Sequence, residues 1–232
     1  GGGPVVPASP RPLARTRAEP VWPVAFVNIG GIANITWVSR EGRLIAFDTG
    51  PGNALIDQWV SAHAGIPYDQ GGAIASEGIV LPDLAGRYLA SAYLERPYPK
   101  SLDRNDFPVP EAEAASLEDG ARTLAHVTAA TLARALDLVP EAPRLVIVCG
   151  GGRRNAIVIS DLEALVAGRK PGTVRVATAE AFGLDGDAME AEAWAYLAVR
   201  SLRGLTITWP DTTGTGHPVT GGRLSYPSAA GR

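Results

Sequence analysis

Three short apolar runs between residues 24 and 48 dominate the hydrophobic pattern of the first part of the chain. The first, VAFVNI, ends at Gly30-Gly31, and the second ends near a polar turn at Arg40-Glu41-Gly42. The third covers 43–47 and ends on Asp48, where a loop rich in glycine and proline begins. Short turns with glycine suit a twisted antiparallel hairpin because glycine tolerates a positive φ. The pattern therefore predicts three strands joined by tight turns.

The following residues alternate between helical and strand patterns. Apolar spacing predicts helices over about 53–63, 82–94, 117–138, 155–167 and 187–202, and apolar runs predict strands over 144–149 and 173–177. Asn53 is expected to cap the first helix, and Ser116 with Asp119 the third. A hairpin followed by alternating helices and strands indicates an α/β fold, in which flanking helices cover a mixed sheet.

Three segments lack this periodicity. Residues 1–23 hold six prolines and are interpreted as an extended connector that precedes a single unit over 24–232. Residues 95–115 are polar and rich in proline, and a loop of this length is more often functional than merely connective. The tail over 204–232, rich in Thr, Gly and Pro, is expected to have little regular structure.

Composition narrows the classes of function. The chain is 46% hydrophobic and 19% charged, with a net charge of -3, which is ordinary for a soluble globular protein and gives no basic surface for nucleic acid. No apolar run approaches the roughly 20 residues of a membrane span, and no signal peptide is visible. The single cysteine, Cys149, follows an apolar run and is expected to be buried, which fits a reducing compartment. The three histidines lack neighbours at metal-ligand spacing, so no metal site is expected.

Asp48 is the strongest catalytic candidate. A carboxylate at the end of a buried strand lies where ligands collect in an open α/β sheet, and it could take a proton from a hydroxyl or a water. An Asp before Thr-Gly also caps turns commonly, so local features alone leave both interpretations open.

Glycines in two places could hold phosphate. Gly30 and Gly31 join two strands, and Gly150, Gly151 and Gly152 lie between a strand and a helix whose N-terminus favours negative charge. The second segment lacks the Lys-Ser/Thr of a Walker A motif and could equally be a bare turn. Lys100 and Arg104 of the long loop could reach an anion, although such residues are more often only solvated.

Five motifs in this order resemble those of the anhydro-N-acetylmuramic acid kinase family, which belongs to the actin/hexokinase/Hsp70-like ATPase superfamily. They are NIGGIANIT (28–36), FDTGPGN (47–53), PKSLDRNDF (99–107), CGGGRRN (149–155) and TAEAFGLDGDAMEAEAWAYLA (178–198). The resemblance runs from Gly1 to about Pro227 and implies an actin-like (ribonuclease H-like) lobe. The family's N-terminal lobe, with its Ser-Gly-Thr-Ser phosphate loop, has no counterpart here. We therefore expect this chain alone to hold half of the nucleotide site, to lack kinase activity and to self-associate.

The resemblance implies a reaction in which ATP, water and 1,6-anhydro-N-acetylmuramic acid give ADP and N-acetylmuramic acid 6-phosphate. Asp48 would act as the base toward the water. Gly30 and Gly31 would hold phosphate, Gly150–Gly152 with Asn155 would bind adenosine, and Asn53 and Glu190 would contact the sugar. Mg²⁺ would accompany ATP. The family also implies cell-wall recycling in the cytoplasm and a homodimer of the full-length protein.

Three alternatives remain open at this point. The chain could be another sugar kinase of the superfamily, or a non-catalytic module that binds sugar or nucleotide. It could also be a glycoside hydrolase that uses Asp48 and Glu190, which would require carboxyl groups roughly 5–10 Å apart across a sugar cleft. Glu190 shares a helical face with Trp194, at a spacing of four residues, but a solvated Glu is the more common case.

Overall fold

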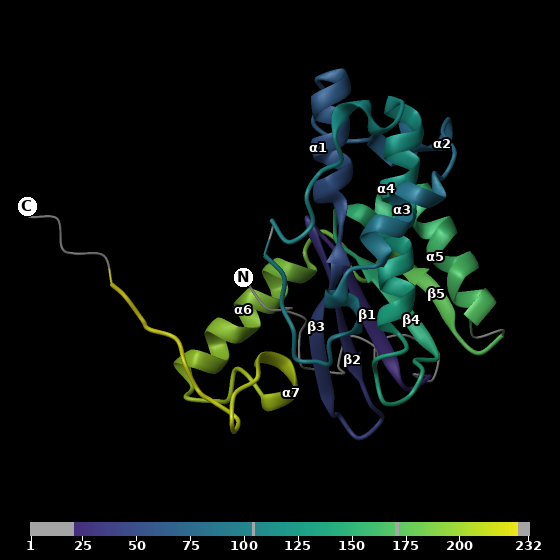
Figure 1. Ribbon diagram of the computed structural model, residues 1–232. Coiled ribbons are helices and arrows are strands. Elements are labelled where there is room, and N and C mark those ends of the chain that lie inside the picture. Colours follow the sequence, from purple (N-terminus) through teal and green to yellow (C-terminus); the bar gives the residue numbers. More distant parts are fainter. Residues whose placement is uncertain (1–20, 104, 170–171, 227–232) are drawn as a thin grey trace, which may run out of the picture.

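The computed structural model describes residues 21–103, 105–169 and 172–226 (Figure 1). Most of the predicted connector, and Arg104, therefore lie outside the described residues. The five strands of the sheet are β1 (Val24–Ile29), β2 (Ile32–Val38), β3 (Leu44–Pro51), β4 (Leu145–Cys149) and β5 (Arg175–Thr178). All five were predicted from the apolar runs, and the predicted α/β class with a mixed sheet is confirmed.

The strand order is β3-β2-β1-β4-β5. The pairs β1–β2 and β2–β3 are antiparallel hairpins, whereas β1–β4 and β4–β5 are parallel. Strands β1, β3, β4 and β5 consequently run in the same direction, and their carboxyl ends meet at one edge of the sheet. Ligands of open α/β sheets bind outside this edge, so the Gly30-Gly31 turn, Pro51 and Gly150 are gathered where a site is expected.

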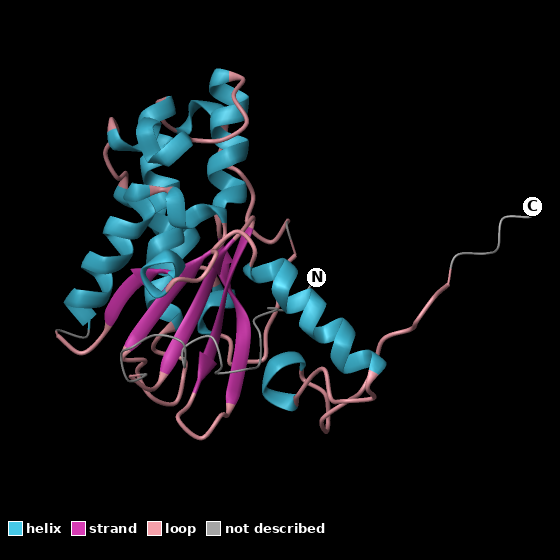
Figure 2. Ribbon diagram, turned by 180° about the vertical axis from the view of Figure 1, so that it is seen from behind, coloured by secondary structure: helices cyan, strands magenta, loops and turns pink. Residues whose placement is uncertain are grey.

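Most of the helices lie on one face of the sheet (Figure 2), and residues 179–189 pack on the other face. The α-helices are α1 (Asn53–Ala64), α2 (Ala73–Ser76), α3 (Pro82–Leu89), α4 (Leu117–Ala135), α5 (Ala156–Arg169), α6 (Met189–Leu202) and α7 (Pro210–Thr213). Short 3₁₀ turns are η2 (Gln70–Gly72), η3 (Ala92–Glu95), η4 (Ala112–Ala114), η5 (Gly151–Arg154) and η6 (Ala179–Phe182). Among the described residues, no helix has the length and apolarity needed to cross a membrane.

The alternation of β1 divides the core into two layers. Ala25, Val27 and Ile29 face the larger cluster, which is completed by side chains of α1, α3, α4 and α5. Val24 and Phe26 face a smaller cluster that includes the start of α6. Cys149 belongs to this second cluster and is 2% exposed, which confirms its predicted burial. Figure 1 shows the larger helical layer on one side of the sheet, with α6 and α7 apart from it beside β3.

The structure corrects the predicted end of the third strand. β3 continues past Asp48 to Pro51, because β2 pairs with it as far as Ile32 opposite Pro51. An irregularity between Ala33 and Asn34 shifts the register, and the Thr49 hydroxyl donates to the Ala33 carbonyl at 3.1 Å. Asp48 therefore lies within a strand and not at its end.

Other predicted bounds also change. The helix expected over 82–94 is α3 followed by the separate turn η3, and α4 ends at Ala135 rather than 138. Ser116 does cap α4, accepting from the Asp119 amide at 3.1 Å. The tail is more structured than predicted, since it contains α7 and a bridge between Thr208 and Val219.

Candidate active site

The Gly30-Gly31 turn is tied to the loop that follows β3. The amides of Asn53 and Gly52 donate to the carbonyls of Gly30 (2.8 Å) and Gly31 (3.0 Å). A Cβ atom at Gly52 would lie 2.2 Å from the Gly30 carbonyl oxygen, so the close approach of the two segments requires glycine. Neither Gly30 nor Gly31 has a positive φ, which corrects the conformational reason given for these two glycines. The close packing of the two loops is the structural reason for glycine in this region.

The glycines after β4 lie against the carboxyl end of β1. Gly150 has φ +76°, and a Cβ atom there would lie 2.3 Å from the Asn28 Oδ1 atom. A Cβ atom at Gly152 would lie 2.2 Å from Cγ2 of Ile29. At Gly151 the nearest atom to such a Cβ is 3.8 Å away, so this backbone faces open space. Gly150 and Gly152 pack the loop against the sheet, and Gly151 leaves room for a ligand.

Two asparagines fix the ends of neighbouring helices. Asn53 does not cap α1 with its side chain, contrary to prediction, because Gly52 occupies the cap position. Its Nδ2 atom instead donates to the Ile29 carbonyl at 3.3 Å, which links α1 to β1. Asn155 precedes α5, and its Oδ1 atom accepts from the amides of Ile157 (3.1 Å) and Val158 (3.2 Å).

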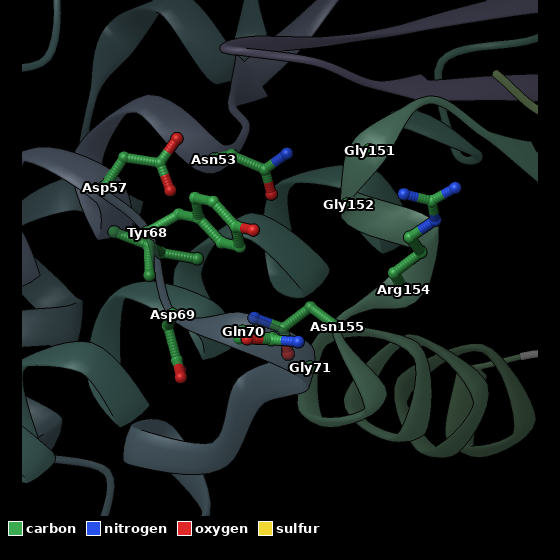
Figure 3. A pocket seen from close by; sticks show the side chains of 11 residues that line it. Asn53, Asp57, Tyr68, Asp69, Gln70, Gly71, Gly151, Gly152, Arg154 and Asn155 are labelled. Carbon is green, nitrogen blue, oxygen red and sulfur yellow. The ribbon is translucent and has the colours of Figure 1, made fainter. Parts of the chain in front are cut away.

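A cavity of about 350 Å³ lies between α1, the η2 turn and the glycine loop (Figure 3). It brings together four residues that the sequence predicted as ligand-binding: Asn53, Gly151, Gly152 and Asn155. The structure adds lining residues that the sequence analysis missed, namely Ile56, Asp57, Tyr68, Asp69, Gln70, Gly71 and Arg154. One signal was available for Asp57, because it follows Asn53 by four residues and therefore shares its helical face.

Asp48 lies outside this cavity and is held by the loop that crosses β3. Its amide donates to the Lys100 carbonyl at 3.1 Å, and its own carbonyl accepts from the Tyr93 hydroxyl at 2.7 Å. The Oδ2 atom accepts from the Leu102 amide at 2.9 Å. The residue is only 4% exposed, and burial raises the pKa of its carboxyl although the Leu102 amide opposes the shift. The carboxylate is therefore fixed in direction and kept more basic than an ordinary Asp.

Lys100 supports this loop rather than binding an anion. Its Nζ atom donates to the carbonyls of Tyr93 (3.0 Å) and Leu94 (3.1 Å), and lies 4.6 Å from the centre of the Tyr93 ring. The side chain is 7% exposed, and burial lowers its pKa to about 8. The expectation that Lys100 reaches an anion is not supported by this geometry, because the ammonium group is directed into the protein.

Asp48 and the Gly30-Gly31 turn lie on one line along the sheet. Pro51 is opposite Ile32, the residue that follows the turn, and Asp48 is opposite Asn34. Three residues of strand span about 10 Å. The Gly30-Gly31 turn is therefore separated from Asp48 by about 10 Å along the strand direction.

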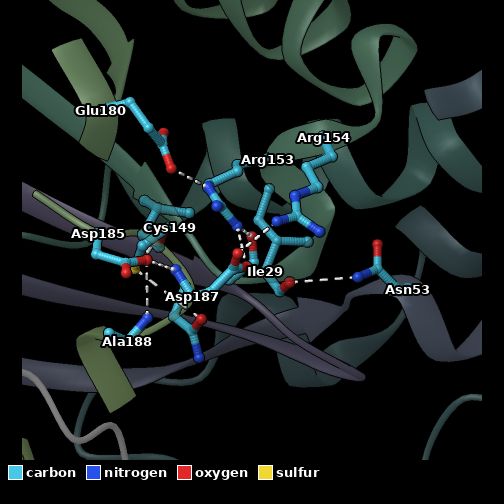
Figure 4. Close-up of polar contacts among 12 residues, drawn as sticks. Ile29, Asn53, Cys149, Arg153, Arg154, Glu180, Asp185, Asp187 and Ala188 are labelled. Carbon is cyan, nitrogen blue, oxygen red and sulfur yellow. Dashed lines mark hydrogen bonds and ion pairs between the residues drawn. The ribbon is translucent and has the colours of Figure 1, made fainter. Parts of the chain in front are cut away.

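Arg153 connects the glycine loop to the segment before α6 (Figure 4). Its guanidinium donates to Glu180 (2.7 Å), to Asp187 (2.7 Å) and to the Gly150 carbonyl (2.9 Å). Its side chain is 6% exposed, whereas the Glu180 and Asp187 side chains are 49% and 51% exposed. The position of the loop is thus coupled to the segment that precedes α6.

Glu190, predicted to contact the sugar, is not brought into the cavity. It lies in the first turn of α6 and is exposed, as is Trp194 on the same face. Among the residues described, no three His, Cys, Asp or Glu side chains are grouped in a way that could hold a metal ion.

The fold of the chain has a counterpart among solved structures. A solved xyloylose kinase from Brucella ovis, 16% identical, has a similar fold with a TM-score of 0.50, over 92% of this chain and 44% of that one. The architecture is that of an actin-like ATPase lobe, as predicted. The sequence profile of the family described as anhydro-N-acetylmuramic acid kinase matches residues 1–227. The chain belongs to that family.

Curated relatives agree with this assignment. An anhydro-N-acetylmuramic acid kinase from Rhizobium johnstonii is 54% identical over 226 residues, and one from Rhizobium etli is 52% identical over 226 residues. Each match covers 97% of this chain but 60% of the relative. The chain therefore spans about three fifths of the length of these proteins.

Proposed function

We propose that this chain forms one lobe of a kinase that acts on 1,6-anhydro-N-acetylmuramic acid. Residues 24–232 would supply one wall of the site, and the part of the relatives outside the match would supply the other. The family assignment and the 60% coverage support this division. The reaction would serve recycling of the cell wall in the cytoplasm.

The arrangement of Asp48 is the observation that carries the proposal. One carboxylate oxygen is held by the Leu102 amide, and among the described residues the Oδ1 atom has no hydrogen-bond partner. A general base needs this combination of fixed aim and one free oxygen. Burial raises the pKa of Asp48, which makes its carboxylate a better proton acceptor than that of an ordinary Asp.

In the proposed reaction, Asp48 takes a proton from a water that attacks the anomeric carbon of the sugar. The new C1–O bond forms as the C1–O6 bond of the anhydro ring breaks, and O6 receives the γ-phosphoryl group of ATP. General-base catalysis typically contributes about 10²–10⁴-fold, so orientation and charge stabilisation supply the remainder.

The nucleotide would occupy the cavity beside the glycine loop, with its phosphates directed along the Gly30-Gly31 turn toward Asp48. The open backbone at Gly151 and the carbonyl-bonded Asn53 suit a ligand at this edge. Mg²⁺, when bound with ATP, would neutralise phosphate charge, and it commonly takes most of its ligands from phosphates and water rather than from a protein cage.

The test uses a joined kinase, defined as this chain fused to the part of the Rhizobium johnstonii relative outside the match. Asp48→Asn keeps the size of the side chain and removes the proton acceptor. We expect sugar phosphorylation to fall by about 10²–10⁴-fold, with nucleotide affinity nearly unchanged. Asp83→Asn, at an exposed position on α3, is the matched control. Turnover within a few-fold of the unmodified enzyme would refute the role of Asp48.

A further inference from the structure

Asp57 is a carboxylate without a protein partner inside the proposed nucleotide cavity. It lies on α1, one turn beyond Asn53, and is partly buried. Among the described residues no donor forms a hydrogen bond or ion pair with it, although Asn53, Tyr68 and Arg154 line the same cavity. Figure 3 shows the Asp57 carboxylate beside Asn53 and Tyr68, at the opposite end of the cavity from Arg154.

A ligand that brings hydrogen-bond donors would lower the cost of placing a carboxylate here. Burial and the nearby charge of Asp69 raise the pKa of Asp57 to about 6, so the protein alone disfavours its ionised form. Asp69 itself is not short of donors. Its two carboxylate oxygens accept hydrogen bonds from the backbone amides of Ile74 (2.8 Å) and Ala75 (3.0 Å). Asp69 thus stabilises the start of α2, whereas Asp57 keeps both oxygens available for donors from outside the protein.

We propose that Asp57 accepts hydrogen bonds from the ribose hydroxyls of the bound nucleotide and makes the cavity selective for ribonucleotides. Carboxylates that bind ribose hydroxyls are a recurring device in nucleotide-binding α/β proteins. The inference rests on the proposed function, since it assigns the sugar of the nucleotide to one end of the cavity. The phosphates then extend toward the glycine turns.

Two features favour ribose over a metal ion as the occupant. A divalent cation held at Asp57 by the protein alone would require further ligands, and within the described parts of the chain no three acidic or His/Cys side chains come together. A cation bound with the nucleotide would lie at its phosphates, which the proposal places at the glycine turns. Asp69, the neighbouring acid, already has its oxygens occupied by amides. Hydroxyl groups supply donors at a partly buried carboxylate without a new charge.

The test measures the affinity of the joined kinase for ADP, 2′-deoxy-ADP and 3′-deoxy-ADP by calorimetry, because this chain is proposed to supply only one wall of the nucleotide site. We expect at least one deoxy analogue to bind about tenfold more weakly than ADP, because a hydrogen bond to a charged group is lost. Asp57→Asn should weaken ADP binding about tenfold and abolish the discrimination. Asp83→Asn should change neither.

Three results would overturn the inference in different ways. Equal affinities of the unmodified joined kinase for ADP and both deoxy analogues would exclude ribose recognition by Asp57 while leaving a nucleotide cavity in place. No ADP binding at all would remove the nucleotide cavity itself, and the ribose contact with it. Loss of ADP binding in Asp57→Asn with lost thermal stability would point to a structural role, whereas the ribose contact predicts weaker binding with unchanged or higher stability.

Discussion

Asp48 and Asp57 are nine residues apart in the sequence, and burial raises the pKa of both, yet the structure holds them in opposite ways. Asp48 lies on β3, where the Leu102 amide binds its carboxylate and Lys100 and Tyr93 bind its backbone. Asp57 lies on α1, faces a cavity and has no donor among the described residues. The same residue type is therefore oriented by the protein in one place and left for a ligand in the other.

The difference separates two kinds of chemistry. A base must point at one proton, so the protein supplies the bonds that fix its direction. A binding group gains most when its donors arrive with the ligand, because protein donors would compete for the same oxygens. The comparison predicts that changes around Asp48 affect turnover and changes around Asp57 affect nucleotide affinity.

The largest expected effect comes from removing a side chain that supports the loop around Asp48. Lys100→Met preserves the length of the side chain but leaves the Leu94 carbonyl without its buried donor, whereas the Tyr93 carbonyl keeps the Arg96 amide. We expect the unfolding free energy of the chain to fall by about 2–4 kcal/mol, because an unsatisfied buried carbonyl costs about 1–3 kcal/mol and the lost contacts of the ammonium with the Phe47 and Tyr93 rings add about 0.5–1 kcal/mol. Urea denaturation measures the change. An unaltered midpoint would show that the ammonium group does not support the loop.

The next largest effect comes from a change in the glycine loop that lines the cavity near Asp57. Gly152→Ala places a Cβ atom 2.2 Å from Ile29, whose side chain is fully buried in β1. Overpacking of this kind costs about 1–3 kcal/mol, and the displaced loop should weaken ADP binding. Gly151→Ala is the control for stability alone, since its Cβ atom would lie 3.8 Å from the nearest protein atom. Equal stability of the two variants would contradict the packing described here.

Asp57→Asn tests the environment of Asp57 through the pH dependence of the unfolding free energy. The folded pKa of Asp57, about 6, exceeds the ordinary value of 3.8, so the native state binds more protons between these values and the unfolding free energy falls as pH rises through them. Asn does not titrate. After a discount for partial exposure, we expect the variant to be more stable by about 1–2 kcal/mol above pH 6. This difference in unfolding free energy should vanish below about pH 4. If it persisted there, the raised pKa of Asp57 would not be its cause.

The smallest effect concerns a single hydroxyl. Tyr93→Phe removes the donor to the Asp48 carbonyl and retains the ring against which Lys100 lies. We expect a loss of about 1 kcal/mol in unfolding free energy and a modest fall in turnover of the joined kinase, with nucleotide affinity unchanged. A larger effect on nucleotide affinity than on turnover would show that Tyr93 supports nucleotide binding and not the orientation of Asp48.

The sequence predicted the strands and the glycine-rich edge because both depend on local pattern. The run before Cys149 reads as a buried strand from its apolar residues alone. The bonds that orient Asp48 were not predictable, since Leu102 is 54 residues away and only the fold brings its amide to Oδ2. The extension of β3 to Pro51 depends similarly on β2, whose pairing overrides the turn propensity of Gly50 and Pro51.

The most direct test compares Asp48→Asn and Asp57→Asn in the joined kinase, since both exchange one carboxylate oxygen for an amide. The two quantities are turnover at saturating ATP and the dissociation constant for ADP. The account predicts that Asp48→Asn lowers turnover by about 10²–10⁴-fold at nearly constant ADP affinity. It predicts that Asp57→Asn weakens ADP binding about tenfold and loses far less turnover. Parallel losses of both quantities in both variants would contradict a separation of base and nucleotide contact.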